Sequence, residues 1–322
     1  MRSRVKFALF GLLAALACNA LAQGTRDTRT LRIVVITSPG ASADFAARLI
    51  AEKLGPRLGR PVVVENKTGA GGNLATEFVA RSAPDGSTLL LTANNHNVNP
   101  ALYAKTPYDP ERDFAPVIQV AQGPSVLVAH PSVPVNTVQE LLAELRARPN
   151  RMSYGSGGIG NPGHIQGELF KFMSGTSMVH VPYKGAAPAI ADVVAGQIPL
   201  AFGSLVSALP HIRAGKLKPL ALTSAARWAG TPEIPTLAES GVPGYAYDVW
   251  LGIMAPRATP AAVVAELNRE IAAILAEAEV REKIRSQGME AVGRPVADFE
   301  AMLREDLAKS VRLVREAGIK AE

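Results

Sequence analysis

A glycine-rich stretch in the middle of the chain carries a spacing that can bind dinucleotides. Its glycines Gly155, Gly157 and Gly160 lie within SYGSGGIGNPGHIQGELF, residues 153–170. A G-x-G-x-x-G turn between a strand and a helix lets the backbone approach a pyrophosphate at the helix N-terminus. Such a turn can also hold another anion, because the first N–H groups of a helix have no partner within it.

The residues after this turn argue against a dinucleotide. A nicotinamide or flavin site needs an acidic residue about 20 positions further on, where the next strand ends. In this chain that region reads HVPYKGAAP, residues 180–188, and contains no acidic residue. We therefore predict that the turn holds another ligand and that the protein binds no cofactor.

Two further turns have the same character. They read TSPGASAD, residues 37–44, and NKTGAGGN, residues 66–73, and a helical pattern follows each. Glycine lets the backbone approach a ligand oxygen closely, and a helix N-terminus favours negative charge. Three such turns favour a carboxylate or phosphate ligand held between them.

The elements that must position these turns alternate between strand and helix. The apolar run LRIVVIT, residues 31–37, precedes a helical pattern, and the alternation continues along the chain, which is typical of α/β sheets. Apolar stretches in residues 114–131, broken at Gly123–Pro124, and in residues 247–256 are candidates for crossings between two domains.

These two crossings predict one discontinuous and one inserted domain. The first domain takes residues 24–122 and 253–322, and the second takes residues 123–252. Ligands prefer the clefts between domains, so we expect the three turns to meet there.

The N-terminus has the features of a secretory signal. Basic residues precede the apolar run FALFGLLAALA, residues 7–17, which is too short to span a bilayer, and Ala20–Leu21–Ala22 offers a cleavage site. We predict a signal peptide over residues 1–22 and a periplasmic location. Alternatively, Cys18 in ALAC weakly resembles the acceptor of a lipid anchor.

The composition excludes several functions. Cys18 is the only cysteine of the 322 residues, so a mature chain that begins after Ala22 has no disulfide, thiol nucleophile or cysteine metal site. The net charge of +6 falls when the basic leader is removed, and no basic run is interleaved with aromatic residues. Nucleic-acid binding therefore has no support.

Two arrangements could serve an enzyme or a metal. Ser156 lies in YGSGG, but Tyr154 stands where a G-x-S-x-G nucleophile elbow needs glycine. His164 and Glu168 are four residues apart on one predicted helix, yet no third ligand is near them in the sequence. Capping and packing explain this pair better, and we predict neither catalysis nor a metal.

The longer motifs resemble one family. The stretches VVVENKTGAGGNLATEFVARSAPDGSTLLL, SYGSGGIGNPGHIQGELF, HVPYKGAAPAIADVVAGQIPLAF and IPTLAESGVPGY are similar to those of the substrate-binding proteins of tripartite tricarboxylate transporters, the Bug or TctC family. The resemblance covers residue 31 to the end. It implies a type II periplasmic binding-protein fold, with two α/β domains that close over a small organic acid.

The resemblance also implies which residues bind the acid, largely through backbone N–H groups, small polar side chains and water. Carried over by position, the expected ligand-binding residues are Ser38, Gly40, Ala41, Asp44, Gly71, Gly72, Asn73, Asn94, Asn95, His96, Ser156, Gly157, Gly160, His164, Tyr183, Lys184, Gly185, Gly203 and Ser204.

The turn at residues 37–44 departs from the family pattern P-P-G-G-x-x-D. Ser38 replaces a proline and Ala41 replaces the second glycine, so the ligand can differ from simple dicarboxylates. Asp44 is open to two interpretations, a ligand contact or a favourable charge at a helix N-terminus. Lys184 is likewise either a carboxylate partner or a solvated lysine.

The expected function is delivery of a small carboxylate to the membrane permease subunits of a tripartite transporter by a monomeric binding protein. A sensory protein that presents its ligand to a receptor is the main alternative, and an exported hydrolase is the weaker one.

Overall fold

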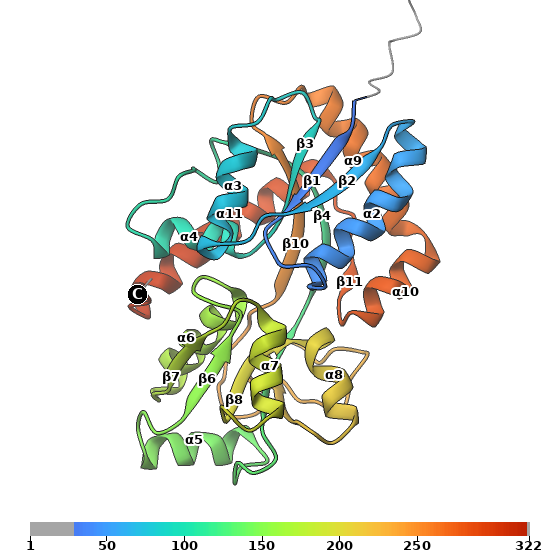
Figure 1. Ribbon diagram of the computed structural model, residues 1–322. Coiled ribbons are helices and arrows are strands. Elements are labelled where there is room, and N and C mark those ends of the chain that lie inside the picture. Colours follow the sequence, from blue (N-terminus) through green and yellow to red (C-terminus); the bar gives the residue numbers. More distant parts are fainter. Residues whose placement is uncertain (1–28, 321–322) are drawn as a thin grey trace, which may run out of the picture.

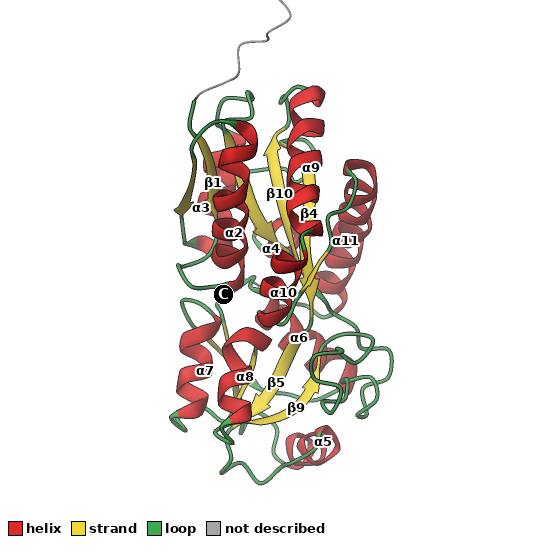
Figure 2. Cartoon of the chain, turned by 90° about the vertical axis from the view of Figure 1, so that its right-hand side faces the viewer, coloured by secondary structure: helices red, strands yellow, loops and turns green. Residues whose placement is uncertain are grey.

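The computed structural model describes residues 29–320, and these residues form two β-sheets, each flanked by helices (Figures 1 and 2). We call the six-stranded sheet with its helices the first lobe and the five-stranded sheet with its helices the second lobe. The first lobe contains both ends of the described chain, drawn in blue and in orange to red in Figure 1. The α/β architecture predicted from the sequence is confirmed. The predicted signal peptide and Cys18 lie outside the described residues.

The sheet of the first lobe has the order β11-β4-β10-β3-β1-β2. Its strands are β1 (Leu31–Val35), β2 (Val62–Asn66), β3 (Thr88–Ala93), β4 (Phe114–Gly123), β10 (Val249–Pro256) and β11 (Glu290–Ala291). Strands β1, β2 and β3 are parallel, whereas β10 runs antiparallel to β3 and β4. Ile33 in β1 pairs with Val64 and Leu89, and Ile33 and Leu89 are fully buried, which explains the continuous apolar runs of these inner strands.

Helices cover this sheet and complete its core. They are α2 (Ser42–Leu58), α3 (Asn73–Ala80), α4 (Asn95–Leu102), α9 (Ala261–Ala276), α10 (Ala278–Ser286) and α11 (Val296–Glu316), with a short 3-10 helix η1 (Ala70–Gly72) before α3. The apolar stripes of α2 and α9 face the sheet, and Leu54 and Ile271 have no exposed surface.

The second lobe has the strand order β7-β6-β8-β5-β9. Its strands are β5 (Ser125–Ala129), β6 (Ser153–Ser156), β7 (Val179–Pro182), β8 (Leu200–Ser204) and β9 (Lys218–Leu222), and its helices are α5 (Val138–Ala147), α6 (Pro162–Ser174), α7 (Ala186–Val194) and α8 (Leu205–Arg213). Strands β6, β7 and β8 are parallel.

Helix α5 begins with the capping box that its sequence predicts. Thr137 Oγ1 accepts from the backbone N–H of Glu140 at 3.1 Å, and the Glu140 carboxylate accepts from the backbone N–H of Asn136. Two N–H groups outside the helical ladder are thereby satisfied.

The chain passes between the sheets twice. Strand β4 ends at Gly123 in the first sheet and β5 begins at Ser125 in the second; the chain returns from β9 to β10. Gly123 is required at the first passage because an added Cβ would lie 2.6 Å from the Gly288 carbonyl oxygen.

The two lobes present the same kind of edge to each other. The carboxyl ends of β1, β2 and β3 and those of β6, β7 and β8 lie toward the junction between the lobes (Figure 1). A small apolar cluster joins the lobes beside this junction, with Val98 and Leu102 from α4, Ile165 from α6, and Val314 and Ile319 from the C-terminal region. Among the helices of residues 29–320, none has the length and apolar character needed to cross a membrane.

Candidate functional site

The turn after β1 leads into a helix that lacks a side-chain cap. Ala41 is the N-cap residue of α2 and has no side chain that can accept from the first turn. Gly40, at φ +84°, reverses the chain before it and is exposed, as is Ser38. The first N–H groups of this helix are therefore suited to an anion, and the helix dipole favours one.

Asp44 holds this turn in shape. Its carboxylate is 3% exposed and accepts from the Gly40 N–H at 2.9 Å, from Asn66 Nδ2 at 2.9 Å and from the Arg48 side chain at 3.1 Å. Burial raises the pKa of this carboxyl, but the hydrogen bonds from Arg48, Gly40 and Asn66 outweigh it and lower the pKa below its usual value. With its oxygens occupied by these donors, Asp44 acts on the turn rather than as an open ligand contact.

The turn after β2, residues 66–73, is the second turn, and side chains of α4 hold it in place. The Gly71 carbonyl accepts from Asn99 Nδ2 at 3.0 Å and from Asn95 Nδ2, and Asn73 Oδ1 accepts from Asn99 Nδ2 at 2.7 Å. Gly71 and Gly72 adopt positive φ, and Gly72, the N-cap of α3, offers no side-chain cap. This turn therefore places a second uncapped helix start at the same edge of the sheet.

Two residues after β3 that were predicted to bind the ligand make contacts within the first lobe. Asn94 donates to the Asp248 carbonyl at 3.0 Å and accepts from the Trp250 N–H at 3.1 Å, which ties the end of β3 to the beginning of β10. His96 is 1% exposed and packs against Tyr108 and Phe114, at ring distances of 5.4 and 4.9 Å. Burial lowers the pKa of His96 to about 4.

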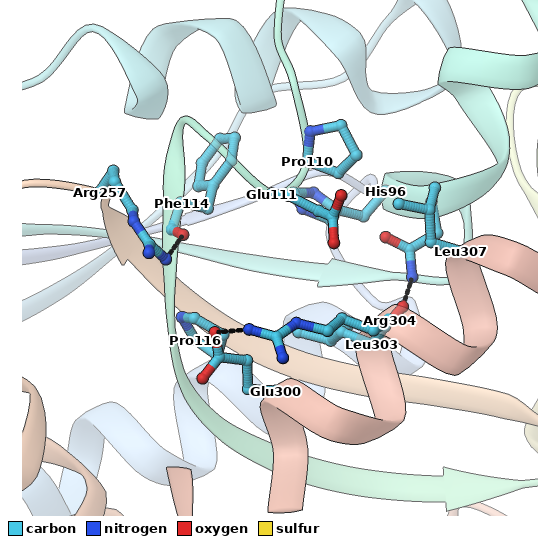
Figure 3. Close-up of a pocket in the computed structure, with 11 residues that line it drawn as sticks. His96, Pro110, Glu111, Phe114, Pro116, Arg257, Glu300, Leu303, Arg304 and Leu307 are labelled. Atoms are coloured by element: carbon cyan, nitrogen blue, oxygen red, sulfur yellow. Dashed lines mark hydrogen bonds and ion pairs between the residues drawn. The ribbon is translucent and has the colours of Figure 1, made fainter. Parts of the chain in front are cut away.

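His96 lines a cavity remote from the three turns. This cavity of about 240 Å³ lies between α4, the segment before β4 and α11, and Glu111, Arg257 and Arg304 are among its other lining residues (Figure 3). None of its lining residues belongs to a glycine-rich turn. The structure therefore does not bring His96 together with the other predicted ligand contacts.

The glycine loop of the second lobe, residues 156–161, satisfies much of its own backbone. Ser156 Oγ accepts from the Gly158 N–H at 3.2 Å, and His164 Nδ1 accepts from the Gly160 N–H at 3.3 Å. Asn161 caps α6 by accepting from the Gly163 N–H at 3.1 Å. This loop is thus less open to an anion than its G-x-G-x-x-G spacing predicts.

The glycine loop instead seats on the first lobe. A Cβ added at Gly160 would lie 2.5 Å from Asn99 Oδ1, and one added at Gly71 would lie 3.0 Å from the Ile159 carbonyl oxygen. Gly160 adopts φ +75° and Gly71 φ +62°, so conformation and close approach both require glycine at these positions. At Gly71 the two turns meet backbone to backbone, and at Gly160 the loop backbone meets the Asn99 side chain.

The remaining predicted residues end the other parallel strands of the second lobe. Tyr183 donates to Asp192 at 2.7 Å, and burial together with this contact raises its pKa to about 12. Lys184 is exposed, and Gly185, at φ +126°, is the uncapped N-cap of α7. Ser204 makes no capping bond to α8, although it is its N-cap residue and lies 2.9 Å from Ser207 Oγ.

Gly203 lies inside β8, where an added Cβ would meet Ile190 Cδ1 at 2.7 Å. The close packing of α7 on β8 explains why this position is glycine.

Sequence reasoning missed three residues that organise the site: Asn66, Asn99 and His180. Asn66 could have been found as a polar residue at the end of a strand. Asn99 gave no such signal, because it lies in NNHNVNP, which does not have the pattern of a helix.

The fold brings His180 within 2.7 Å of Ser156 Oγ, which is a nucleophile–base distance. Ser156 has no exposed surface, however, and burial beside His164 and Lys171 lowers the pKa of His180 to about 3. The pair cannot present an activated hydroxyl to a substrate. Glu168 is likewise engaged, accepting from Tyr154 at 2.7 Å and from Lys171 at 2.8 Å, and the described residues include no group of three potential metal ligands around it.

Known proteins share both the sequence and the fold. The sequence model described as "Tripartite tricarboxylate transporter family receptor" matches residues 46–319. Protein BugT of Bordetella pertussis is 33% identical over 317 residues, and the match covers 97% of each chain.

Two solved structures are similar throughout. The structure of R. palustris Rpa4515 with adipate has a TM-score of 0.87 and 37% identity, covering 92% of this chain and 99% of that one. MatC from Rhodopseudomonas palustris with bound malate has a TM-score of 0.84 and 30% identity, covering 89% and 99%. This likeness confirms the periplasmic binding-protein fold predicted from the sequence.

Proposed function

The chain belongs to the tripartite tricarboxylate transporter receptor family, whose members are periplasmic solute-binding proteins and not enzymes, and we propose that it captures a small carboxylic acid between its two lobes. One observation carries the proposal. The turn after β1 is anchored by Asp44 and presents the uncapped first turn of α2 at the edge of the sheet that lies toward the second lobe.

This arrangement suits a carboxylate in particular. Free N–H groups and a helix dipole attract a compact anion, and the turn offers the Ser38 hydroxyl beside them. Arg48, in the second turn of α2, is paired with Asp44 at 3.0 Å. Neutral donors would then bind one carboxylate without a bidentate arginine clamp.

We assign the ligand contacts to uncapped helix starts in both lobes. In the first lobe they are the starts of α2 and α3, at Gly40, Ala41, Gly72 and Asn73. In the second lobe they are the uncapped starts of α7 and α8, at Gly185 and Ser204, with Tyr183 and Lys184 beside them. Asp44 holds the turn before α2 in place, Asn94 ties β3 to β10, and Ser156 and His164 hold the glycine loop.

Two related proteins indicate the size of the acid. Rpa4515 was solved with adipate and MatC with malate, both small dicarboxylates. A ligand that bridges both lobes stabilises the closed form in proportion to its differential affinity for that form. We propose that the closed form delivers the acid to the membrane subunits of a tripartite transporter, as a monomer in the periplasm.

Native mass spectrometry of the purified mature protein tests this function first. We expect an additional mass that is released on denaturation and identified as a carboxylic acid. If none is retained, the melting temperature is measured with adipate, malate and an aromatic acid, and with adipamide as the uncharged control. A bound acid at 100 times its Kd stabilises the folded state by about 2.7 kcal/mol.

The outcomes separate clearly. Stabilisation by an acid and not by adipamide supports carboxylate capture. An equal shift with adipamide, or no retained acid and no shift with any acid, contradicts it.

A further inference from the structure

Two histidines lie directly beneath the glycine loop. The rings of His164 in α6 and His180 in β7 stack at 4.3 Å, and each ring contacts the loop through one nitrogen. Tyr154 lies on the other face of His180, at a ring distance of 5.0 Å. The loop that seats on the first lobe therefore rests on a pair of titratable side chains.

The bond to His164 fixes which nitrogen carries its proton. Its Nδ1 accepts from the Gly160 N–H at 3.3 Å, so Nδ1 is bare and the neutral ring carries hydrogen on Nε2. Protonation of Nδ1 would set two N–H groups against each other and remove the acceptor of Gly160.

The bond to His180 depends on the Ser156 hydroxyl. Ser156 Oγ accepts from the Gly158 N–H at 3.2 Å and has one hydrogen of its own, which can go to His180 Nε2 at 2.7 Å. A doubly protonated His180 must itself donate through Nε2. The hydroxyl hydrogen would then turn to the Gly158 carbonyl, at the longer distance of 3.3 Å.

The surroundings oppose a positive charge on this pair. The titratable groups that face it are Tyr154 from β6 and Glu168 and Lys171 from α6, with Tyr245 beyond Tyr154. Glu168 already accepts from Tyr154 and Lys171, and it is not among the groups that shift the pKa of His180. Burial, His164 and Lys171 together lower the pKa of His180 to about 3.

The loop that these rings hold makes one of the contacts between the lobes. Gly160 lies against Asn99, which in turn binds the Gly71 carbonyl and Asn73 of the second turn. A displaced Gly160 would no longer fit this surface, because Asn99 is 1% exposed and its amide group is fixed by two acceptors.

We propose that His164 and His180 are positioning residues for ligand capture. As neutral imidazoles they hold the glycine loop in the shape that seats on the first lobe, and low pH releases the loop. The effect of the loop on ligand capture rests on the proposed function, whereas the hold of the two histidines on the loop does not.

The expected direction with pH follows from proton uptake. A histidine freed from the loop has an ordinary pKa of about 6.5, whereas the held loop keeps His180 neutral down to about pH 3. Over this range the released loop binds more protons. Its population therefore rises as pH falls, by up to about tenfold per pH unit for the proton that His180 takes up.

Amide hydrogen exchange of the ligand-free mature protein, followed by NMR, measures this release. We expect the protection factors of the Gly158 and Gly160 amides to fall about tenfold or more between about pH 7.5 and pH 5. In the double variant His164→Asn/His180→Gln, the amides of Asn and Gln can stand in for Nδ1 and Nε2. They do not titrate, so protection should become independent of pH.

His211→Asn is the matched control, because His211 lies in α8 outside this cluster, and this variant should keep the wild-type profile. Adipate and malate are then titrated into wild type, the double variant and the control at both pH values. The acid's own titration is common to all three proteins, so their difference reports the imidazoles.

Protection that does not change with pH in wild type, or that still changes in the double variant, overturns the proposal. If lowering the pH reduces the affinity for adipate and malate equally in wild type and in the double variant, the effect of the loop on ligand capture is overturned. If protection follows pH while neither acid binds at any pH, the carboxylate function fails and the hold of the histidines on the loop stands.

Discussion

The turn after β1 and the glycine loop after β6 look alike in sequence and differ in what their backbones do. The first ends at an uncapped helix, and Asp44 holds its Gly40 N–H. In the second, the N–H groups of Gly158 and Gly160 donate to Ser156 and His164, and Asn161 caps the helix that follows. One turn is available to an anion, and the other is a surface that seats on the opposite lobe.

This difference shows that glycine content alone does not identify an anion site. Glycine allows close approach, but the approaching group can be a ligand or another backbone. Whether the N–H groups have acceptors within the chain distinguishes the two cases. Substitutions in the two turns test this distinction, and the substitution at Gly160 should have the largest effect.

Gly160→Ala should reduce ligand affinity most. Its Cβ would lie 2.5 Å from Asn99 Oδ1 in the seated loop, and opening of the lobes would relieve this clash. We expect a loss of about 100-fold, equivalent to about 2.7 kcal/mol. Calorimetric titration with adipate measures it, and small-angle scattering reports whether the lobes still close.

Gly175→Ala is the matched control for backbone strain. Gly175 ends α6 with φ +63°, close to the +75° of Gly160, and nothing lies within 4 Å of an added Cβ. It should lower the melting temperature without changing affinity. Equal affinity losses in both variants would mean that the seat between the lobes has no special role.

Asp44→Ala comes next and tests the anchored turn. Removing a buried carboxylate with three donors should cost about 2 kcal/mol of folding free energy and roughly tenfold in affinity, because the turn loses its shape. Chemical denaturation and titration with adipate measure both. The matched control is Asp298→Ala, an exposed first-turn aspartate of α11, for which only about 0.3–1 kcal/mol is expected.

The pH dependence of Asp44 sharpens this test. Its lowered pKa means that the carboxylate stabilises the fold fully above the unfolded value of about 3.9 and loses this effect only as pH falls through the folded value. Asp44 therefore contributes no change in stability between about pH 5 and pH 8. Equal effects of the Asp44 and Asp298 variants would instead support the simple helix-charge interpretation.

The sequence predicts most of the architecture and only part of the site. Strand runs such as LRIVVIT, the capping box at Thr137 and the α6 boundaries are local patterns, and the structure confirms the predicted α/β class. Helix α4 escaped prediction, because NNHNVNP has poor helix formers and only Val98 and Leu102 at apolar spacing. Its asparagines are held by long-range bonds that no local pattern shows.

The difference between the two turns was hidden for the same reason. His180 lies 24 residues beyond Ser156 and reaches it only because β6 and β7 pair in parallel, with Tyr154 opposite His180. His96 shows the converse case. The family resemblance implied a ligand contact there, but the ring of His96 lines a cavity beside α11.

Ser38→Ala should have the smallest effect and tests whether the first turn touches the ligand directly. Ser38 is exposed, and its side chain donates no hydrogen bond within residues 29–320. The variant should leave the melting temperature of the ligand-free protein unchanged. A lost neutral hydrogen bond is worth about 0.5–1.5 kcal/mol, so adipate affinity should fall by about three- to tenfold.

Ser286→Ala, at the exposed end of α10, is the control, because it removes a hydroxyl remote from both turns and should not affect affinity. An unchanged affinity in Ser38→Ala would place the ligand away from the first turn, and the anion would then have to be sought at the starts of α7 and α8. A loss confined to Ser38→Ala would locate the acid at the uncapped start of α2, which is where the contrast between the two turns places it.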